Sequence, residues 1–208
     1  MNEHETSHES DAIHTEIAIL LDRSGSMYDI REDMEGGLWQ LILDQHQAPG
    51  RCSVSLYTFD DVFEVSFEAR PAGEIRPEDC RCGPRGSTAL FDAVVRCLSG
   101  IERRLERLDE ARRPELVSVV VVTDGYENSS TEHNLANVQR AVQRVTEKFG
   151  WNFSFLAADL EGFRQGAAFT HNIEDADAHH FEREESRSAT HALSERLLER
   201  RSARSRRR

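Results

Sequence analysis

The sequence contains a single lysine, Lys148, among its 26 lysines and arginines. A nucleotide-binding P-loop requires a Gly-x-x-x-x-Gly-Lys motif, and no such motif surrounds this lysine. The sequence also lacks a run of roughly 18–20 apolar residues, the length that a membrane-spanning helix requires. The first fifteen residues, MNEHETSHESDAIHT, contain no apolar stretch of the kind found in secretory signal peptides. We therefore expect a cytoplasmic protein that does not enter a membrane.

The four cysteines do not form the pattern of a secreted disulfide framework. Cys52 and Cys97 fall in a predicted strand and a predicted helix, where a reduced cysteine behaves as a small apolar residue. Cys80 and Cys82 form an isolated Cys-x-Cys pair, whereas a thiolate metal site normally needs two further ligands at compatible spacing. We interpret this pair as reduced loop thiols. The nine histidines lack the fixed spacing of metal ligands, so we expect solvated or core roles for them.

Acidic residues outnumber basic ones, 38 to 26, and give a formal charge of −12. Residues 196–208 contain seven arginines and one glutamate, so this end carries +6 and the remainder −18. An acidic body repels phosphates, so we expect no specific binding of nucleic acid. Composition favours a flexible acidic leader at 1–14 and a disordered Arg-rich tail at 200–208. A single domain at 15–199 lies between them.

Buried strands are predicted at several points of this domain. Five apolar residues precede Asp22 in the segment EIAILLD, residues 16–22, which is typical of a strand buried on both faces. The segment LVSVVVV, residues 116–122, is the most hydrophobic and predicts the central strand, and 151–158 predicts another. Two β-rich runs, 52–59 and 62–67, flank Asp60-Asp61 and predict a hairpin.

Helices are predicted between these strands from apolar residues spaced by three or four. The first contains Met34 and ends near Ala48-Pro49-Gly50, the second extends over 90–108, and the third ends at Gly150, a natural C-cap. The regular pattern covers the core, 15–160. In 161–199 we expect a short helix at 163–169, a short edge strand at 179–181 and a final helix at 189–198. The alternation predicts a Rossmann-like three-layer α/β/α sandwich, whose mostly parallel sheet has one antiparallel edge strand.

Three oxygen-rich segments lie where strands end or helices begin: DRSGS at 22–26, GST at 86–88 and TDG at 123–125. In open α/β sheets, ligands bind outside the carboxyl ends of the strands. Carboxylate and hydroxyl oxygens suit Mg²⁺, Mn²⁺ or Ca²⁺ better than zinc. We therefore predict a divalent cation site, with Mg²⁺ as the first choice. Its ligands are Asp22, Ser24, Ser26, Thr88 and Asp124.

Each segment also has a simpler explanation. The Asp-x-Ser-x-Ser pattern arises by chance, Thr88 could be a helix N-cap, and Asp124-Gly125 could be a turn. We expect Gly25 and Gly125 to let the backbone turn sharply beside the ion. With only two carboxylates, the charge of the cation is not fully compensated, so it would attract a carboxylate from outside.

These three segments resemble the metal ion-dependent adhesion site of von Willebrand factor A domains, over roughly residues 15–160. The resemblance implies that Ser24, Ser26 and Thr88 contact the metal directly in some states. It implies that Asp22 and Asp124 often act through water. The segments LDRSGSM at 21–27, TDGYEN at 123–128 and FGWNFSFLAAD at 149–159 are similar to small stand-alone bacterial and phage members of this family. This likeness implies no enzyme activity and names no partner.

We predict a metal-dependent protein-binding module, a monomer whose cation binds an Asp or Glu of a protein partner. The loops around the site would select that partner. Asp60-Asp61 and Glu127 also have simpler roles, in a hairpin turn and in helix capping respectively. Trp39 and Trp151 are expected in the core. The rim residues that we expect at the interface are Met27, Tyr28, Asp60, Asp61, Ser87, Gly125, Tyr126 and Glu127.

Two alternatives belong to other functional classes. Oxygen-bound Mg²⁺ also serves phosphoryl chemistry, which would make the protein a hydrolase or phosphotransferase. Against this, the first strand ends in Asp-Arg-Ser rather than Asp-x-Asp, and no Ser–His–Asp order occurs in a nucleophile-elbow context. The second alternative is a scaffold with a structural metal site, whose Arg-rich tail makes the contacts.

Overall fold

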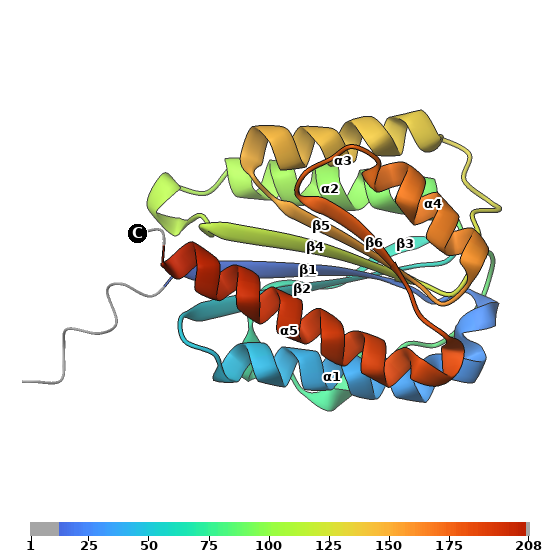
Figure 1. Cartoon of the computed structure of the whole chain (residues 1–208), viewed down its shortest axis with the longest axis horizontal. Helices are drawn as coiled ribbons and strands as arrows, with labels where there is room; N and C mark the ends of the chain where they lie inside the picture. Colours follow the sequence, from blue (N-terminus) through green and yellow to red (C-terminus); the bar gives the residue numbers. More distant parts are fainter. Residues whose placement is uncertain (1–12, 207–208) are drawn as a thin grey trace, which may run out of the picture.

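The computed structural model describes residues 13–206, apart from the side chain of residue 184 (Figure 1). Within this range, one six-stranded sheet has the order β3-β2-β1-β4-β5-β6. Neighbouring strands are parallel except for β2 and β3, which form the predicted hairpin. The strands are β1 (His14–Asp22), β2 (Arg51–Phe59), β3 (Phe63–Pro71), β4 (Leu116–Thr123), β5 (Asn152–Ala157) and β6 (Ala176–His180). The predicted mixed sheet with one antiparallel edge strand is therefore confirmed.

Helices cover both faces of the sheet and make three layers (Figure 1). On one face lie α1 (Arg31–Gln47) and α5 (Ser186–Ser205). On the other lie α2 (Leu90–Glu106), α3 (Leu135–Phe149) and α4 (Leu160–Thr170). Short 3₁₀ helices occur at η1 (Gly25–Ile30), η2 (Ala72–Glu74), η3 (Pro77–Cys80), η4 (Glu110–Arg112) and η5 (Arg183–Glu185). All eight residues of β4 are buried, as expected for a central strand with helices on both sides.

Local stop signals place the ends of α1 and α3 correctly, whereas α4, β6 and α5 each begin three residues before the predicted segments. α1 ends at Gln47, directly before Ala48-Pro49-Gly50, and α3 ends at Phe149, followed by its C-cap Gly150 with a φ of 65°. Glycine enters this left-handed region without steric cost, which explains the predicted stop. β1 begins at His14, two residues before the predicted strand, because its first residues pair with β2 and extend the parallel register.

The predicted disordered tail from residue 200 is wrong up to residue 206, because α5 continues to Ser205. Arg200 donates to Ser154 Oγ at 3.1 Å and pairs with Asp177 at 2.9 Å. Burial alone would raise the pKa of Asp177. Hydrogen bonds from His179 and Ser154 and the charge of Arg200 instead lower it to about 2. Residues 207–208 lie outside the described residues.

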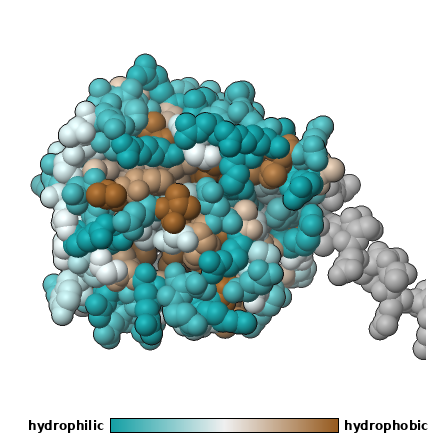
Figure 2. Space-filling model, turned by 180° about the vertical axis from the view of Figure 1, so that it is seen from behind, coloured by the Kyte–Doolittle hydropathy of each residue, from teal (hydrophilic) through white to brown (hydrophobic). Residues whose placement is uncertain are grey.

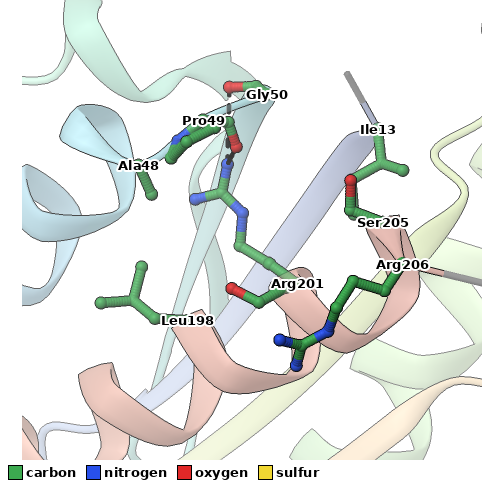
Figure 3. A pocket seen from close by; sticks show the side chains of 9 residues that line it. Ile13, Ala48, Pro49, Gly50, Leu198, Arg201, Ser205 and Arg206 are labelled. Atoms are coloured by element: carbon green, nitrogen blue, oxygen red, sulfur yellow. Dashed lines mark hydrogen bonds between the residues drawn. The ribbon is translucent and has the colours of Figure 1, made fainter. Parts of the chain in front are cut away.

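Arg201 belongs to α5 and is 3% exposed, and its side chain points toward Pro49 and Gly50 in the loop that follows α1 (Figure 3). Its guanidinium donates to the carbonyl oxygens of Gln45 at 2.6 Å and Pro49 at 3.0 Å. Carbonyl groups at the end of a helix have no partner within the helix, so a buried arginine satisfies them here. The side chain therefore joins α5 to the loop that follows α1.

The other end of the chain also departs from the prediction. Ile13 is 2% exposed and His14 belongs to β1, so the expected leader does not include these two residues. The rest of the predicted leader, residues 1–12, lies outside the described residues. None of the helices within residues 13–206 is long and apolar enough to cross a membrane.

The cysteines are free thiols, as expected. Cys80 and Cys82 are both buried, and burial raises the pKa of each to about 12, so neither readily forms a metal-binding thiolate. Between residues 13 and 206, no group of three or more His, Cys, Asp or Glu residues could hold a metal. Trp151 is buried, and Trp39 packs partly buried against the core, as predicted.

The surface is mostly hydrophilic on the side that Figure 2 shows, where apolar residues gather in small separate patches. Lys148 is exposed in the last turn of α3, close to the start of β5, with its Nζ 4.5 Å from the ring centre of Phe149. The exposed large apolar side chains of the described residues are Tyr28, Val62, Val65, Tyr126, Leu135 and Leu160.

Candidate metal site

The sheet brings the predicted site residues to one edge. β1 ends at Asp22 and β4 at Thr123, and the two strands are parallel neighbours with Leu21 opposite Val122. Asp22 is 0% exposed and Asp124, the next residue after β4, is 1% exposed. The parallel register therefore places two buried carboxylates side by side at the carboxyl ends of adjacent central strands.

Hydrogen bonds join the first predicted segment to the second, and the second to the loop that follows the third. The N–H of Gly25 donates to the carbonyl of Gly86 at 3.3 Å, which joins the first segment to the second. The N–H of Thr88 donates to Asn128 Oδ1 at 2.9 Å, and the N–H of Asn128 returns a bond to the Thr88 carbonyl at 3.0 Å. Gly86 has a φ of 69°, and a side chain there would overlap Asp61, so only glycine fits this crossing.

Asp22 is held by two short hydrogen bonds. Its Oδ1 accepts from the Ser24 N–H at 2.6 Å, and its Oδ2 accepts from the Thr123 hydroxyl at 2.5 Å. Burial raises the pKa of Asp22 to about 6, and the bonds from Thr123 and Ser24 only partly oppose this rise. Removal from water destabilises the charged form, so a nearby positive charge would stabilise it.

Asp124 is joined to the serine loop. The Ser26 hydroxyl donates to Asp124 Oδ1 at 2.7 Å, and the hydroxyl oxygens of Ser24 and Ser26 are 3.2 Å apart. Burial raises the pKa of Asp124, opposed by the Ser26 hydrogen bond and the charge of Arg183. Asp124 Oδ2 is buried and accepts no hydrogen bond from residues 13–206. Arg183 Nη2 lies 2.8 Å from that oxygen as an ion pair.

Gly125 leaves the space into which the site oxygens face. A Cβ atom at this position would lie 3.5 Å from Ser26 Oγ, 3.5 Å from Thr88 Oγ1 and 3.9 Å from Asp22 Oδ2. Gly125 and Gly25 have no positive φ, so the expected sharp turn is not the reason for glycine at either position. At Gly125 the missing side chain itself keeps the space open.

The donor set fits a hard divalent cation. Oxygens of Ser26, Thr88 and Asp22 lie beside Gly125, and the hydroxyl of Ser24 and the carboxylate of Asp124 lie within hydrogen-bond distance of Ser26. The alternative for Thr88 fails, because the N-cap of α2 is Ala89 and it makes no side-chain cap. The Phe91 N–H at the start of α2 donates instead to Glu127 Oε2 at 2.9 Å.

Only some of the predicted rim residues are exposed at the surface. Tyr28, Asp61, Ser87 and Tyr126 are exposed. Met27 is 2% exposed and packs in the core, which corrects its assignment to the rim.

Asp60 is a second correction, since it is fully buried. Its Oδ2 accepts from Arg85 Nε at 2.7 Å and Arg23 Nε at 3.1 Å. Burial alone would raise the pKa of Asp60, but its hydrogen bonds and the two arginines lower it. Glu127 is half-buried and caps α2, which confirms the simpler role expected for it.

Two contributors to the site were missed in the sequence. Thr123 stands inside the TDG segment, and its hydroxyl orients Asp22, so its place in the motif was the available signal. Arg183 follows β6, 59 residues after Asp124 in the chain, and its side chain reaches the site from η5. No motif or spacing in the sequence indicates this second contact.

Solved structures with this architecture identify the fold. The vWF domain of the type V pili tip protein Mfa5 from Porphyromonas gingivalis superposes with a TM-score of 0.65 at 8% identity, over 89% of this chain and 95% of that one. The von Willebrand factor type A structure from Catenulispora acidiphila gives 0.60 at 15%, over 88% and 42%. The fold is that of a von Willebrand factor A domain.

A third structure with this fold carries a metal. Proximal thread matrix protein 1 from the mussel byssus, described with a zinc-occupied MIDAS motif, has a TM-score of 0.62 at 15% identity. The match covers 91% of this chain and 47% of the byssus protein, so the chain spans about half of that protein's length. No protein-family model and no curated protein sequence matches the chain. The von Willebrand factor A fold is thus established by structural similarity.

Proposed function

We propose that this von Willebrand factor A domain binds a protein partner through a divalent cation, with Mg²⁺ as the physiological ion. The supporting observation is a group of oxygen-bearing side chains at one edge of the sheet. Ser26, Thr88 and Asp22 lie beside Gly125, and Ser24 and Asp124 lie within hydrogen-bond distance of Ser26. The residues that would hold the ion are Asp22, Ser24, Ser26, Thr88 and Asp124. The cation supplies a positive centre that attracts a carboxylate of the partner.

The surrounding residues prepare this set of oxygens. The Thr123 hydroxyl and the Ser24 N–H fix both oxygens of Asp22, so the carboxylate does not rotate away from the site. The Ser26 hydrogen bond to Asp124 directs the proton of Ser26 toward the carboxylate and leaves the lone pairs of its hydroxyl oxygen for a cation. A site fixed by its neighbours loses little conformational entropy when an ion binds.

The rim favours a protein as the partner. Four exposed apolar side chains follow the carboxyl ends of the four central strands: Tyr28 after β1, Val62 after β2, Tyr126 after β4 and Leu160 after β5. Because these strands are parallel, the four residues lie toward the same edge as the site. Apolar and aromatic contacts around a charged anchor are typical of protein interfaces.

We propose no catalytic role, since the described side chains near the cation serve as ligands, caps and ion pairs. The scaffold alternative requires a free Arg-rich tail from residue 200. Arg201 is instead buried, and residues 200–205 belong to α5. A deletion from residue 200 would therefore remove part of the fold. A cytoplasmic location and a monomeric state stay predictions.

Affinity capture from the native host, with Mg²⁺ and again with EDTA, tests the proposal. Asp22→Ala should lose both Mg²⁺ binding in calorimetry and the captured partner. Asp33→Ala is the matched control, because Asp33 is 52% exposed on α1 and contacts Arg187 rather than the site. Capture that is equally strong with EDTA and with Asp22→Ala would refute a metal-dependent interface.

A further inference from the structure

Arg183 touches two residues of the candidate metal site. Its Nη2 lies 2.8 Å from Asp124 Oδ2, and its Nη1 donates to the Ser26 carbonyl at 3.2 Å. The same two residues are joined by the hydrogen bond from Ser26 to Asp124 Oδ1. One guanidinium group thus contacts both the carboxylate and the backbone of proposed cation ligands.

The position of this arginine is fixed by the chain around it. Phe181 is 6% exposed, and its N–H donates to the Ala157 carbonyl at 3.0 Å, which holds the segment after β6 against the end of β5. η5 and then α5 follow directly. The Arg183 side chain is 37% exposed, so one part of it contacts the site while another remains accessible to a ligand.

The Arg183 contact changes the net formal charge of the site. The formal charges of a divalent cation and of the Asp22 and Asp124 carboxylates sum to zero, so these two ligands alone do not leave the uncompensated charge that we expected from the sequence. Arg183 adds a full positive charge. Asp159 also acts on Asp124, but its Oδ1 accepts from the Gly162 N–H as the N-cap of α4. With Arg183 present, the cation and its contacting groups carry +1, and one partner carboxylate brings this sum to zero.

We propose that Arg183 couples binding of the cation to binding of the partner's carboxylate: it weakens cation binding in the free domain and strengthens binding of the carboxylate. This inference rests on the proposed function and names the residue that sets its selectivity for anions. Arg183 pairs with Asp124, so the cation binds a carboxylate whose charge is already partly neutralised. A carboxylate that binds afterwards is attracted by both the cation and the exposed part of the guanidinium.

Calorimetric titration with Mn²⁺ separates these effects, in high sodium acetate and in sodium chloride of equal ionic strength. In chloride, Arg183→Gln should bind Mn²⁺ roughly tenfold more tightly than the wild type, the size expected for a unit charge near a divalent ion at a water-like dielectric constant. Acetate should strengthen Mn²⁺ binding more in the wild type than in Arg183→Gln. Arg183→Gln should therefore raise the Mn²⁺ affinity in chloride and reduce the gain in affinity that acetate produces. A substitution that merely damaged the site would lower both quantities.

Arg187→Gln is the matched control, because Arg187 is 70% exposed and pairs with Asp33 outside the site. It should behave as the wild type, and Arg183→Lys, which keeps the charge, should bind Mn²⁺ less tightly than Arg183→Gln. Equal or weaker Mn²⁺ binding by Arg183→Gln than by the wild type would overturn the inference. Failure of the wild type itself to bind Mn²⁺ would instead refute the proposed function.

Discussion

The substitution Asp22→Asn should stabilise the domain when no cation is present. Asp22 is fully buried, and its pKa rises from 3.8 to about 6. The carboxyl is therefore ionised above about pH 6 in the folded state and above about pH 4 in the unfolded state. A shift of about two pKa units corresponds to about 3 kcal/mol of lost stability at pH 7.5, since each unit is worth about 1.4 kcal/mol. An amide of the same shape avoids this loss.

The amide can keep both hydrogen bonds of the carboxylate. Its oxygen can accept from the Ser24 N–H, and its NH₂ can donate to the Thr123 hydroxyl oxygen, whose own proton can turn to the Gly125 carbonyl at 3.2 Å. The hydrogen-bonded frame of the site therefore tolerates the substitution. The substitution changes only the charge of this side chain. A negative charge favours a bound cation, but its burial is unfavourable when no cation is present.

Thermal unfolding in EDTA at pH 7.5 measures the effect. For a chain of this size, about 3 kcal/mol corresponds to a rise in Tm of roughly 6–12 °C for Asp22→Asn. Mg²⁺ should raise the Tm of the wild type and leave that of the variant unchanged. The wild type without metal should also gain stability as the pH falls from 7.5 to 5, because the folded carboxyl takes up a proton that the unfolded chain does not.

The matched control is Asp33→Asn, the same change at an exposed surface pair, which should alter stability by less than about 0.5 kcal/mol. An Asp22→Asn variant that is as stable as the wild type in EDTA, or less stable, would refute the reasoning. It would mean that the two short hydrogen bonds to Asp22 already compensate its burial.

Two further predictions concern other parts of the molecule. Gly125→Ala should fold with a nearly unchanged Tm in EDTA but bind Mn²⁺ at least tenfold more weakly by calorimetry. The reason is that its Cβ would fill the space 3.5 Å from Ser26 Oγ and Thr88 Oγ1. Undiminished binding would show that the cation lies elsewhere. Asp177→Asn should lose about 2 kcal/mol at pH 7, because the pKa of Asp177 falls from 3.8 to about 2 on folding. That loss should vanish in unfolding curves recorded from pH 4 down to pH 2, and a difference independent of pH would contradict the assigned cause.

The sheet and its site edge could be predicted because each depends on local signals. Runs of buried apolar residues give the central strands, and the segments ending at Asp22 and Asp124 mark where two of them stop. The order of the strands in space then brings these ends together without further information. Stop signals such as Gly150 act within one turn of a helix, so they too can be recognised in the sequence.

Long-range contacts of arginine could not be predicted in this way. Seven arginines in the last thirteen residues indicate a solvated tail by composition, yet Arg201 is buried because it meets carbonyl groups more than 150 residues away. Arg183 reaches the site for a similar reason, since only the position of β6 beside β5 brings η5 near Asp124. Met27 was assigned to the rim from its neighbours in sequence, but the turn of η1 directs it into the core.

The position of Lys148 offers a practical handle on the site. It is the only lysine of the sequence, it is exposed, and it lies near the start of β5, whereas the proposed metal ligands lie at the carboxyl ends of the strands. Attachment through this side chain would fix the domain to a bead or sensor chip at the end of the sheet opposite the candidate metal site. A molecule attached through Lys148 would present the candidate metal site to the solution, which suits the search for a partner.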